Sequence, residues 1–107
     1  MKDNVVKDKS LEFAVRIVNL YKFLVNEQKE FVMSKQILRS GTSIGANIRE
    51  AEQAQSRADF INKLNIALKE ANETEYWLEL LIRTEYITRE QYESINNDST
   101  EINKLRS

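Results

Sequence analysis

The chain has 107 residues, of which 41% are hydrophobic and 31% charged, and its formal net charge at pH 7 is −1. This length suits one domain with its own core, and the composition is neither that of a disordered chain nor that of a membrane protein. Cysteine and histidine are both absent, which excludes structural zinc sites, thiol nucleophiles and histidine-based catalytic triads. We therefore expect a protein that is not an enzyme, holds no cofactor or metal and binds no small-molecule substrate.

The first residues alternate in charge and lack the apolar block of a signal peptide. No apolar run approaches the ~18 residues that a membrane span needs, so we expect a cytoplasmic protein without a membrane partner. Proline is absent as well, which favours an all-helical domain over a β-rich one with many turns. Positive and negative charges are balanced along the chain, and no segment is a basic arm for nucleic acid.

A first helix is predicted over about residues 10–28, with Ser10 as its N-cap. Its apolar stripe, with spacings of three and four residues, contains Ala14, Ile17, Val18, Tyr21, Leu24 and Val25. Phe13, Leu20 and Phe23 fall outside this stripe and widen the apolar arc to more than half of the helix circumference. One bundle core cannot cover such an arc, so these three side chains are predicted to lie in an interface between subunits.

A second helix, over about residues 31–55, contains Gly41 and Gly45, the only glycines of the chain. In one interpretation Gly41 ends a helix and Ser43 caps the next one. In the other the helix continues, and the two glycines allow another backbone to approach closely. The apolar period continues through both glycines, which favours the continuous helix.

The opposite side of this helix holds the one concentrated basic feature of the sequence. Lys35, Arg39, Arg49 and Arg57 fall within an arc of about 80°. Such a stripe is either a face that meets water or the acids of a neighbouring subunit, or a surface that follows a phosphate backbone. Two acids, Glu50 and Glu52, reduce the positive charge of the stripe, which favours the first interpretation.

A third helix is predicted over about residues 57–84, with Ser56 as N-cap and Asp59 in the first turn. Its core seam is predicted to consist of Phe60, Leu64, Ala67, Ala71, Thr74, Leu78 and Leu81. Ile66, Trp77 and Leu80 project roughly 100° to 160° away from that seam. A helix that is apolar on two faces needs a second partner, and another copy of this chain is the natural one.

A carboxylate cluster on the same helix consists of Glu70, Glu73, Glu75 and Glu79. Without histidine, these acids are expected to meet Arg or Lys across a subunit boundary, or to face water, rather than to bind metal or catalyse a reaction. A last helix over about residues 88–105 begins with a capping box that starts at Thr88. Four helices with short connections predict a single domain over residues 1–107, an antiparallel up-down-up-down four-helix bundle.

Three short motifs carry a resemblance to a known family. They are Leu38-Arg39, then Ser43-Ile44-x-x-Asn47-Ile48-x-Glu50-Ala51, then Phe60-x-x-x-Leu64-x-Ile66-Ala67-Leu68. This pattern resembles the small four-helix bundle proteins encoded in intervening sequences of bacterial 23S rRNA genes. Chains related to that family include the accessory variability protein of diversity-generating retroelements.

The resemblance implies a bundle that assembles as a ring, typically a homopentamer, without enzymatic activity. It also implies that Ser43, Asn47 and Glu50 occupy the polar positions of the family on the second helix. Their short side chains near the two glycines are expected to hydrogen-bond between helices or between subunits.

Two functional hypotheses follow from these observations. The leading one is a non-enzymatic homo-oligomer that acts as an assembly or adaptor module, based on the apolar residues on two sides of the first and third helices. The alternative is a ring that binds RNA or DNA through the basic stripe, associated with rRNA intervening sequences or with a reverse transcriptase. In a ring, each copy would add its own weak stripe to the total affinity.

Overall fold

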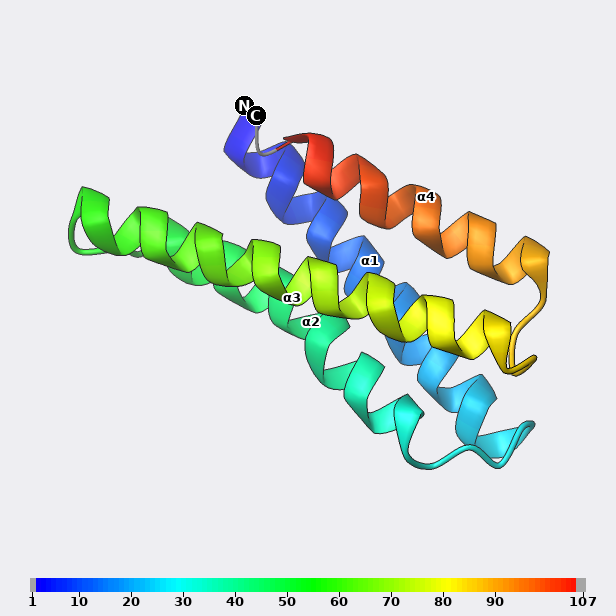
Figure 1. Cartoon of the computed structure of the whole chain (residues 1–107). Coiled ribbons are helices and arrows are strands. Elements are labelled where there is room, and N and C mark those ends of the chain that lie inside the picture. Colours follow the sequence, from blue (N-terminus) through cyan, green and yellow to red (C-terminus); the bar gives the residue numbers. More distant parts are fainter. Residues whose placement is uncertain (1, 106–107) are drawn as a thin grey trace.

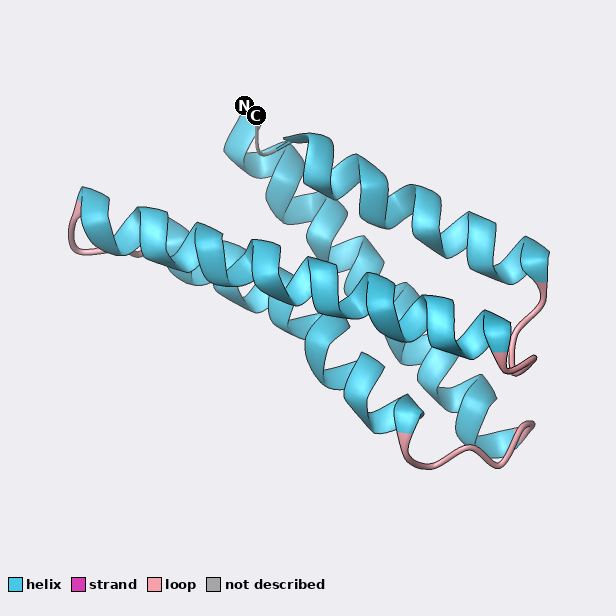
Figure 2. Ribbon diagram, in the orientation of Figure 1, coloured by secondary structure: helices cyan, strands magenta, loops and turns pink. Residues whose placement is uncertain are grey.

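The computed structural model describes residues 2–105, with side chains described for residues 5–103. It contains four helices, α1 (Lys2–Asn26), α2 (Met33–Glu52), α3 (Arg57–Arg83) and α4 (Arg89–Leu105). The described part of the chain contains no strand (Figure 2). The predicted all-α antiparallel up-down-up-down four-helix bundle is therefore confirmed.

Each helix packs against two others. Helix α2 lies against α1 and α3, and α4 lies against the same two helices on the other side. The start of α1 and the end of α4 lie at the same end of the bundle (Figure 1). The turn that joins α2 to α3 extends away from α1 and α4, which gives the molecule its elongated dimensions of 43 × 22 × 18 Å (Figure 1).

The α1 seam in the core differs from the predicted one. Phe13, Ile17, Leu20 and Leu24 are at most 5% exposed and lie in one hydrophobic cluster. Their spacings of four, three and four residues form a single stripe, rotated from the predicted stripe by roughly one residue. The prediction that Phe13 and Leu20 form an interface between subunits is wrong, because α2 and α4 flank α1 and together cover a wide arc of it.

Helix α1 also begins earlier than predicted, and Ser10 does not cap it. Ser10 lies inside α1, is 1% exposed, and donates a hydrogen bond from Oγ to the carbonyl oxygen of Lys7 at 2.9 Å. A Cβ atom at Gly45 would lie 3.3 Å from both the carbonyl and the hydroxyl oxygen of Ser10. A small residue is needed at position 10 because the α2 backbone passes so closely there.

Helix α2 runs unbroken through both glycines, as predicted. A Cβ atom at Gly41 would lie 2.7 Å from Cγ1 of Ile17, closer than side chains approach one another. The absence of a side chain at Gly41 therefore allows α1 to pack directly on α2. The alternative, a break at Gly41 with Ser43 as the next N-cap, is wrong.

Helix α2 is shorter than the predicted span of residues 31–55 and is capped from outside. The carboxylate of Glu30 accepts hydrogen bonds from the N–H groups of Val32, Met33 and Ser34 at 3.2, 3.0 and 2.7 Å. Val32 at the N-cap position supplies no side-chain hydrogen bond. Glu30 is only 8% exposed, so this capping carboxylate is part of the packed structure.

The predicted starts of α3 and α4 are confirmed by their capping hydrogen bonds. Ser56 accepts from the Asp59 N–H at 3.1 Å. Thr88 and Gln91 form a reciprocal capping box, in which each backbone N–H donates to the other side chain at 2.8 and 3.1 Å. The residues of each motif lie close together in sequence, which explains why the sequence alone identifies them.

Candidate functional site

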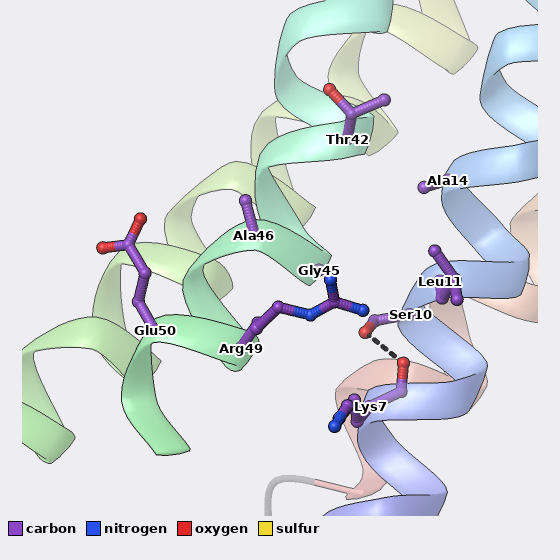
Figure 3. Close-up of a pocket in the computed structure, with 9 residues that line it drawn as sticks. All are labelled: Lys7, Ser10, Leu11, Ala14, Thr42, Gly45, Ala46, Arg49 and Glu50. Atoms are coloured by element: carbon purple, nitrogen blue, oxygen red, sulfur yellow. Dashed lines mark hydrogen bonds between the residues drawn. The ribbon is translucent and has the colours of Figure 1, made fainter. Parts of the chain in front are cut away.

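A surface groove of about 330 Å³ lies between α1 and α2. We call it the α1/α2 groove, and its lining residues are Lys7, Ser10, Leu11, Ala14, Thr42, Gly45, Ala46, Arg49 and Glu50 (Figure 3). The side chain of Arg49 extends from α2 toward Ser10 on α1 (Figure 3). The groove therefore combines an aliphatic wall, a floor of small residues and a guanidinium.

The chemistry of this groove suits binding rather than catalysis. Glu50 is its only carboxylate, and the Ser10 hydroxyl already donates to a backbone carbonyl. Among the described residues, no group of three or more acidic, histidine or cysteine side chains could hold a metal ion. No nucleophile in the groove has a neighbouring base to activate it.

Arg39, predicted to belong to the basic stripe, is held by acids of α3. Its guanidinium donates to both carboxylate oxygens of Glu70 at 3.2 Å and to Glu73. Trp77 Nε1 also donates to Glu73 at 3.2 Å. The hydrogen bond from Arg39, and then that from Trp77, hold the pKa of the Glu73 carboxyl below its ordinary value. Arg39 is thus neutralised within the chain. Glu70 and Glu73 do pair with an arginine, but it belongs to their own chain and not, as predicted, to a neighbouring subunit.

The remaining cations of the predicted stripe lie on two different helices. Lys35 and Arg49 are exposed on α2. Arg57 is exposed as well, but it is the first residue of α3. The prediction that all four cations lie on one helix is therefore wrong for Arg57, because α2 ends at Glu52.

The second predicted interface region, on α3, is partly covered by the chain itself. Trp77 of α3 is half-buried and packs against the core cluster, and so is Phe23, the third predicted interface residue of α1. Ile66 and Leu80 are half-buried too. These four side chains leave part of their surface open, and their role between subunits stays a prediction.

Several large apolar side chains on α1 and α3 are open to solvent, and Leu11, Val15 and Tyr76 were not singled out from the sequence. Ile61 was expected to flank the core seam of the third helix, and Phe60, expected in that seam, is 38% exposed. Leu11 and Val15 of α1 are 52% and 54% exposed, and Ile61 and Tyr76 of α3 are 45% and 58% exposed. Leu11 and Val15 lie on the side of α1 away from the buried stripe that contains Ile17. Their exposure could be predicted from the sequence only if that stripe had been assigned correctly to the core.

The predicted polar links between helices are correct for one residue of three. Glu50 pairs with Lys63 of α3 at 2.9 Å. Ser43 instead donates to the Arg39 carbonyl oxygen at 2.6 Å, and Asn47 donates to the Ser43 carbonyl oxygen at 2.8 Å. Within the chain these two side chains bond to their own helix, since each reaches a carbonyl four residues earlier.

The polar links that the sequence did not reveal include three that join α4 or α2 to their neighbours. Glu75 of α3 accepts hydrogen bonds from Ser99 and Asn103 of α4 at 3.0 and 2.9 Å. Ser40 of α2 and Thr74 of α3 are hydrogen-bonded at 2.9 Å. Both sets need the three-dimensional pairing of helices, which no local motif specifies.

Comparison with known proteins extends this picture. The sequence matches the family described as 23S rRNA-intervening sequence protein over residues 2–107. The chain belongs to the 23S rRNA-intervening sequence protein family. No curated protein matches the sequence. Within the described residues, none of the helices is long and apolar enough to cross a membrane.

A solved structure supports the same assignment. It is the crystal structure of a protein with unknown function from the S23 ribosomal protein family of Bacteroides thetaiotaomicron VPI-5482. Its sequence is 98% identical, the alignment covers 98% of this chain and 90% of that chain, and the TM-score is 0.94. Neither the 23S rRNA-intervening sequence protein family nor this relative carries the name of a catalytic activity.

Proposed function

We propose that this protein is a non-catalytic bundle that assembles with copies of itself and serves as an assembly or adaptor module. The observation that carries the proposal is the open apolar surface on α1 and α3. Leu11, Val15 and Tyr76 are each more than half exposed, although burying a side chain of this size stabilises a structure by roughly 1.5–3 kcal/mol. These side chains form two separate exposed apolar regions, one on α1 and one on α3, and regions of this kind suit contacts between copies.

The proposed assembly is a closed ring. The resemblance to ring-forming bundles supports five copies. A cytoplasmic location is part of the same proposal. The half-buried side chains of Ile66, Trp77 and Leu80 extend the open apolar surface of α3. The absence of cysteine and histidine supports a role without catalysis.

The experiment is the molar mass in solution, measured by light scattering after size exclusion. Replacing Leu11 and Val15 by Lys should reduce the mass to that of a single chain of 12.5 kDa, with helical content by circular dichroism unchanged. The matched control is Asn26→Lys, at an exposed position near the end of α1, which should keep the wild-type mass. An oligomer that survives the double substitution would refute the role of this surface.

A ring that binds RNA or DNA is the second candidate, and the relatives of the family in diversity-generating retroelements would fit it. Lys35 and Arg49 are exposed on the same side of α2, and Lys22 is exposed on the adjacent α1. The name of the family refers to 23S rRNA. Arg39 contributes little to such a surface because Glu70 and Glu73 already bind it.

Binding of a mixed short RNA at low and moderate salt tests this second candidate. Affinity should fall steeply with salt and should drop at least tenfold when Lys35 and Arg49 are both replaced by Glu. Lys69→Glu is the matched control, because Lys69 is exposed on α3. Equal affinity of the two variants would exclude the α2 face as the binding surface.

A further inference from the structure

We infer that copies of this chain associate head to tail, with the α3 ridge of one copy seated in the α1/α2 groove of the next. The α3 ridge is the exposed side of α3 formed by Ile61, Asn72, Tyr76 and Glu79. The inference rests on the proposed self-association and assigns the two surfaces that meet. Three features of the chain support it, namely its charge distribution, the shape of the groove and the free guanidinium in it.

The charges of the bundle are divided between its two halves. The sequence of α1 and α2 contains eight Lys or Arg and five Asp or Glu, a net charge of +3. The sequence of α3 and α4 contains six Lys or Arg and nine Asp or Glu, a net charge of −3. Lys9, Arg16 and Arg39 already pair with acids of α3 and α4 inside the chain. The attraction between copies therefore has to come from the cations and acids outside these pairs.

A symmetric pairing of two identical faces would oppose this charge distribution. Two α1/α2 faces would bring Arg49, Lys22 and Lys35, all exposed, against a second set of the same cations. Like charges placed against one another across an interface repel, so this symmetric arrangement is energetically unfavourable. A contact between different faces leaves the pair with one free groove and one free ridge, and repeated addition then forms a ring or a filament.

The groove offers space for a large side chain, and the α3 ridge presents one. Ala14, Gly45 and Ala46 leave the α1/α2 groove about 330 Å³ in volume, and Leu11 supplies an apolar wall. Tyr76 is the most exposed aromatic side chain on the long helices, at 58%. An aromatic ring seated in such a hollow is the usual anchor of a protein interface.

The charged groups beside these two features also match. Among the described side chains, Arg49 has no ion-pair partner in its own chain. Glu79 follows Tyr76 by three residues, so both lie on the same side of α3. Glu79 is bound by Arg83 of the same helix, and that arginine side chain is 73% exposed, which makes this pair weak. With Tyr76 in the groove, the Glu79 carboxylate is the natural partner for Arg49 of the next copy.

Complementation between two variants tests the inference. The groove variant carries Ala46→Glu and Arg49→Glu and keeps an intact α3 ridge. The ridge variant carries Tyr76→Glu and keeps an intact groove. Each variant alone should have the mass of one chain, 12.5 kDa, with unchanged helical content. An equimolar mixture should contain a species of twice that mass, because one native contact can form, whereas the two altered faces are both acidic and repel.

The control is Gln36→Glu, at an exposed position of α2 that does not line the groove, which should keep the wild-type mass. Two results would overturn the inference while the proposed function stands, provided the wild type is oligomeric. One is a groove or ridge variant that keeps the wild-type mass. The other is a mixture of two folded monomeric variants that stays monomeric. A monomeric wild type would overturn the proposed function together with the inference.

Discussion

The hydroxyl groups of Ser40 on α2 and Thr74 on α3 lie 2.9 Å apart, and both residues are 0% exposed. The Thr74 hydroxyl also lies 2.8 Å from the carbonyl oxygen of Glu70. This bond is a buried side-chain contact between α2 and α3. It favours the observed register of the two helices, because a shifted register would lose this bond and leave each hydroxyl only a carbonyl oxygen of its own helix.

Thr74→Val should lower the free energy of unfolding by about 1–3 kcal/mol, because it leaves the Ser40 hydroxyl buried without this partner. Ser34→Ala is the matched control. The Ser34 hydroxyl is also fully buried, but it has no hydrogen-bond partner among the described residues, so its removal should leave stability unchanged or raise it. Urea unfolding of both variants measures the difference, and equal effects would contradict the assigned role of the Ser40–Thr74 bond.

Glu30 should be the residue on which the start of α2 depends most. Glu30→Ala removes the acceptor of three backbone N–H groups, and we expect a loss of about 1–3 kcal/mol in the free energy of unfolding. Glu27→Ala serves as control, since Glu27 is exposed in the same connection. Hydrogen exchange should speed up at Met33 and Ser34 in the Glu30 variant only. Unchanged protection there would show that another group caps the helix.

Gly41→Ala should destabilise the fold although alanine is the better helix former by about 1 kcal/mol. The new methyl group would collide with Ile17, 2.7 Å from its Cγ1 atom, and overpacking of this kind costs about 1–3 kcal/mol. Gly45→Ala meets its nearest neighbours at 3.3 Å and should cost less. Thermal unfolding compares the two, and a more stable Gly41→Ala variant would mean that α1 and α2 can move apart freely.

The Arg39–Glu73 pair should make stability depend on pH. Its hydrogen bonds hold the pKa of Glu73 below the ordinary value of 4.5. The pair therefore stabilises the fold at pH values above the unfolded pKa, and this contribution disappears as the pH falls through the folded pKa. Because the two side chains are 50% and 37% exposed, the contribution is expected to be under about 1 kcal/mol.

Glu73→Gln should therefore lower the urea midpoint at neutral pH and bring the variant close to the wild type at an acidic pH below the folded pKa of Glu73. The control is Glu93→Gln, whose partner Arg89 lies 3.8 Å away, and which should behave like the wild type at both pH values. A Glu73→Gln difference that persists at the lower pH would show that packing, not the ion pair, is lost.

The features that the sequence predicts well are those coded by neighbouring residues. The Ser56 cap and the Thr88–Gln91 box are complete within four residues, and the structure has both. The continuous apolar period through Gly41 likewise identified a helix–helix contact. Four helices, their order and their antiparallel packing follow from such signals.

The features that the sequence did not predict depend on which helix lies beside which. Ser10 has the chemistry of an N-cap, yet it is small because Gly45 lies against it. Phe13 and Leu20 were assigned to a second face only because a neighbouring stripe was assigned to the core, and both side chains are buried. Arg39 could not be removed from the basic stripe before Glu70 and Glu73 were placed beside it. Each correction needs a partner that is distant in the sequence.

The molar mass of the wild-type protein in solution tests the central claim most directly. Light scattering after size exclusion, at several protein concentrations, should give a constant multiple of the 12.5 kDa chain, with five copies as the expected number. A mass of one chain at every concentration would contradict the claim, because Leu11, Val15 and Tyr76 would then remain exposed to water in the working protein.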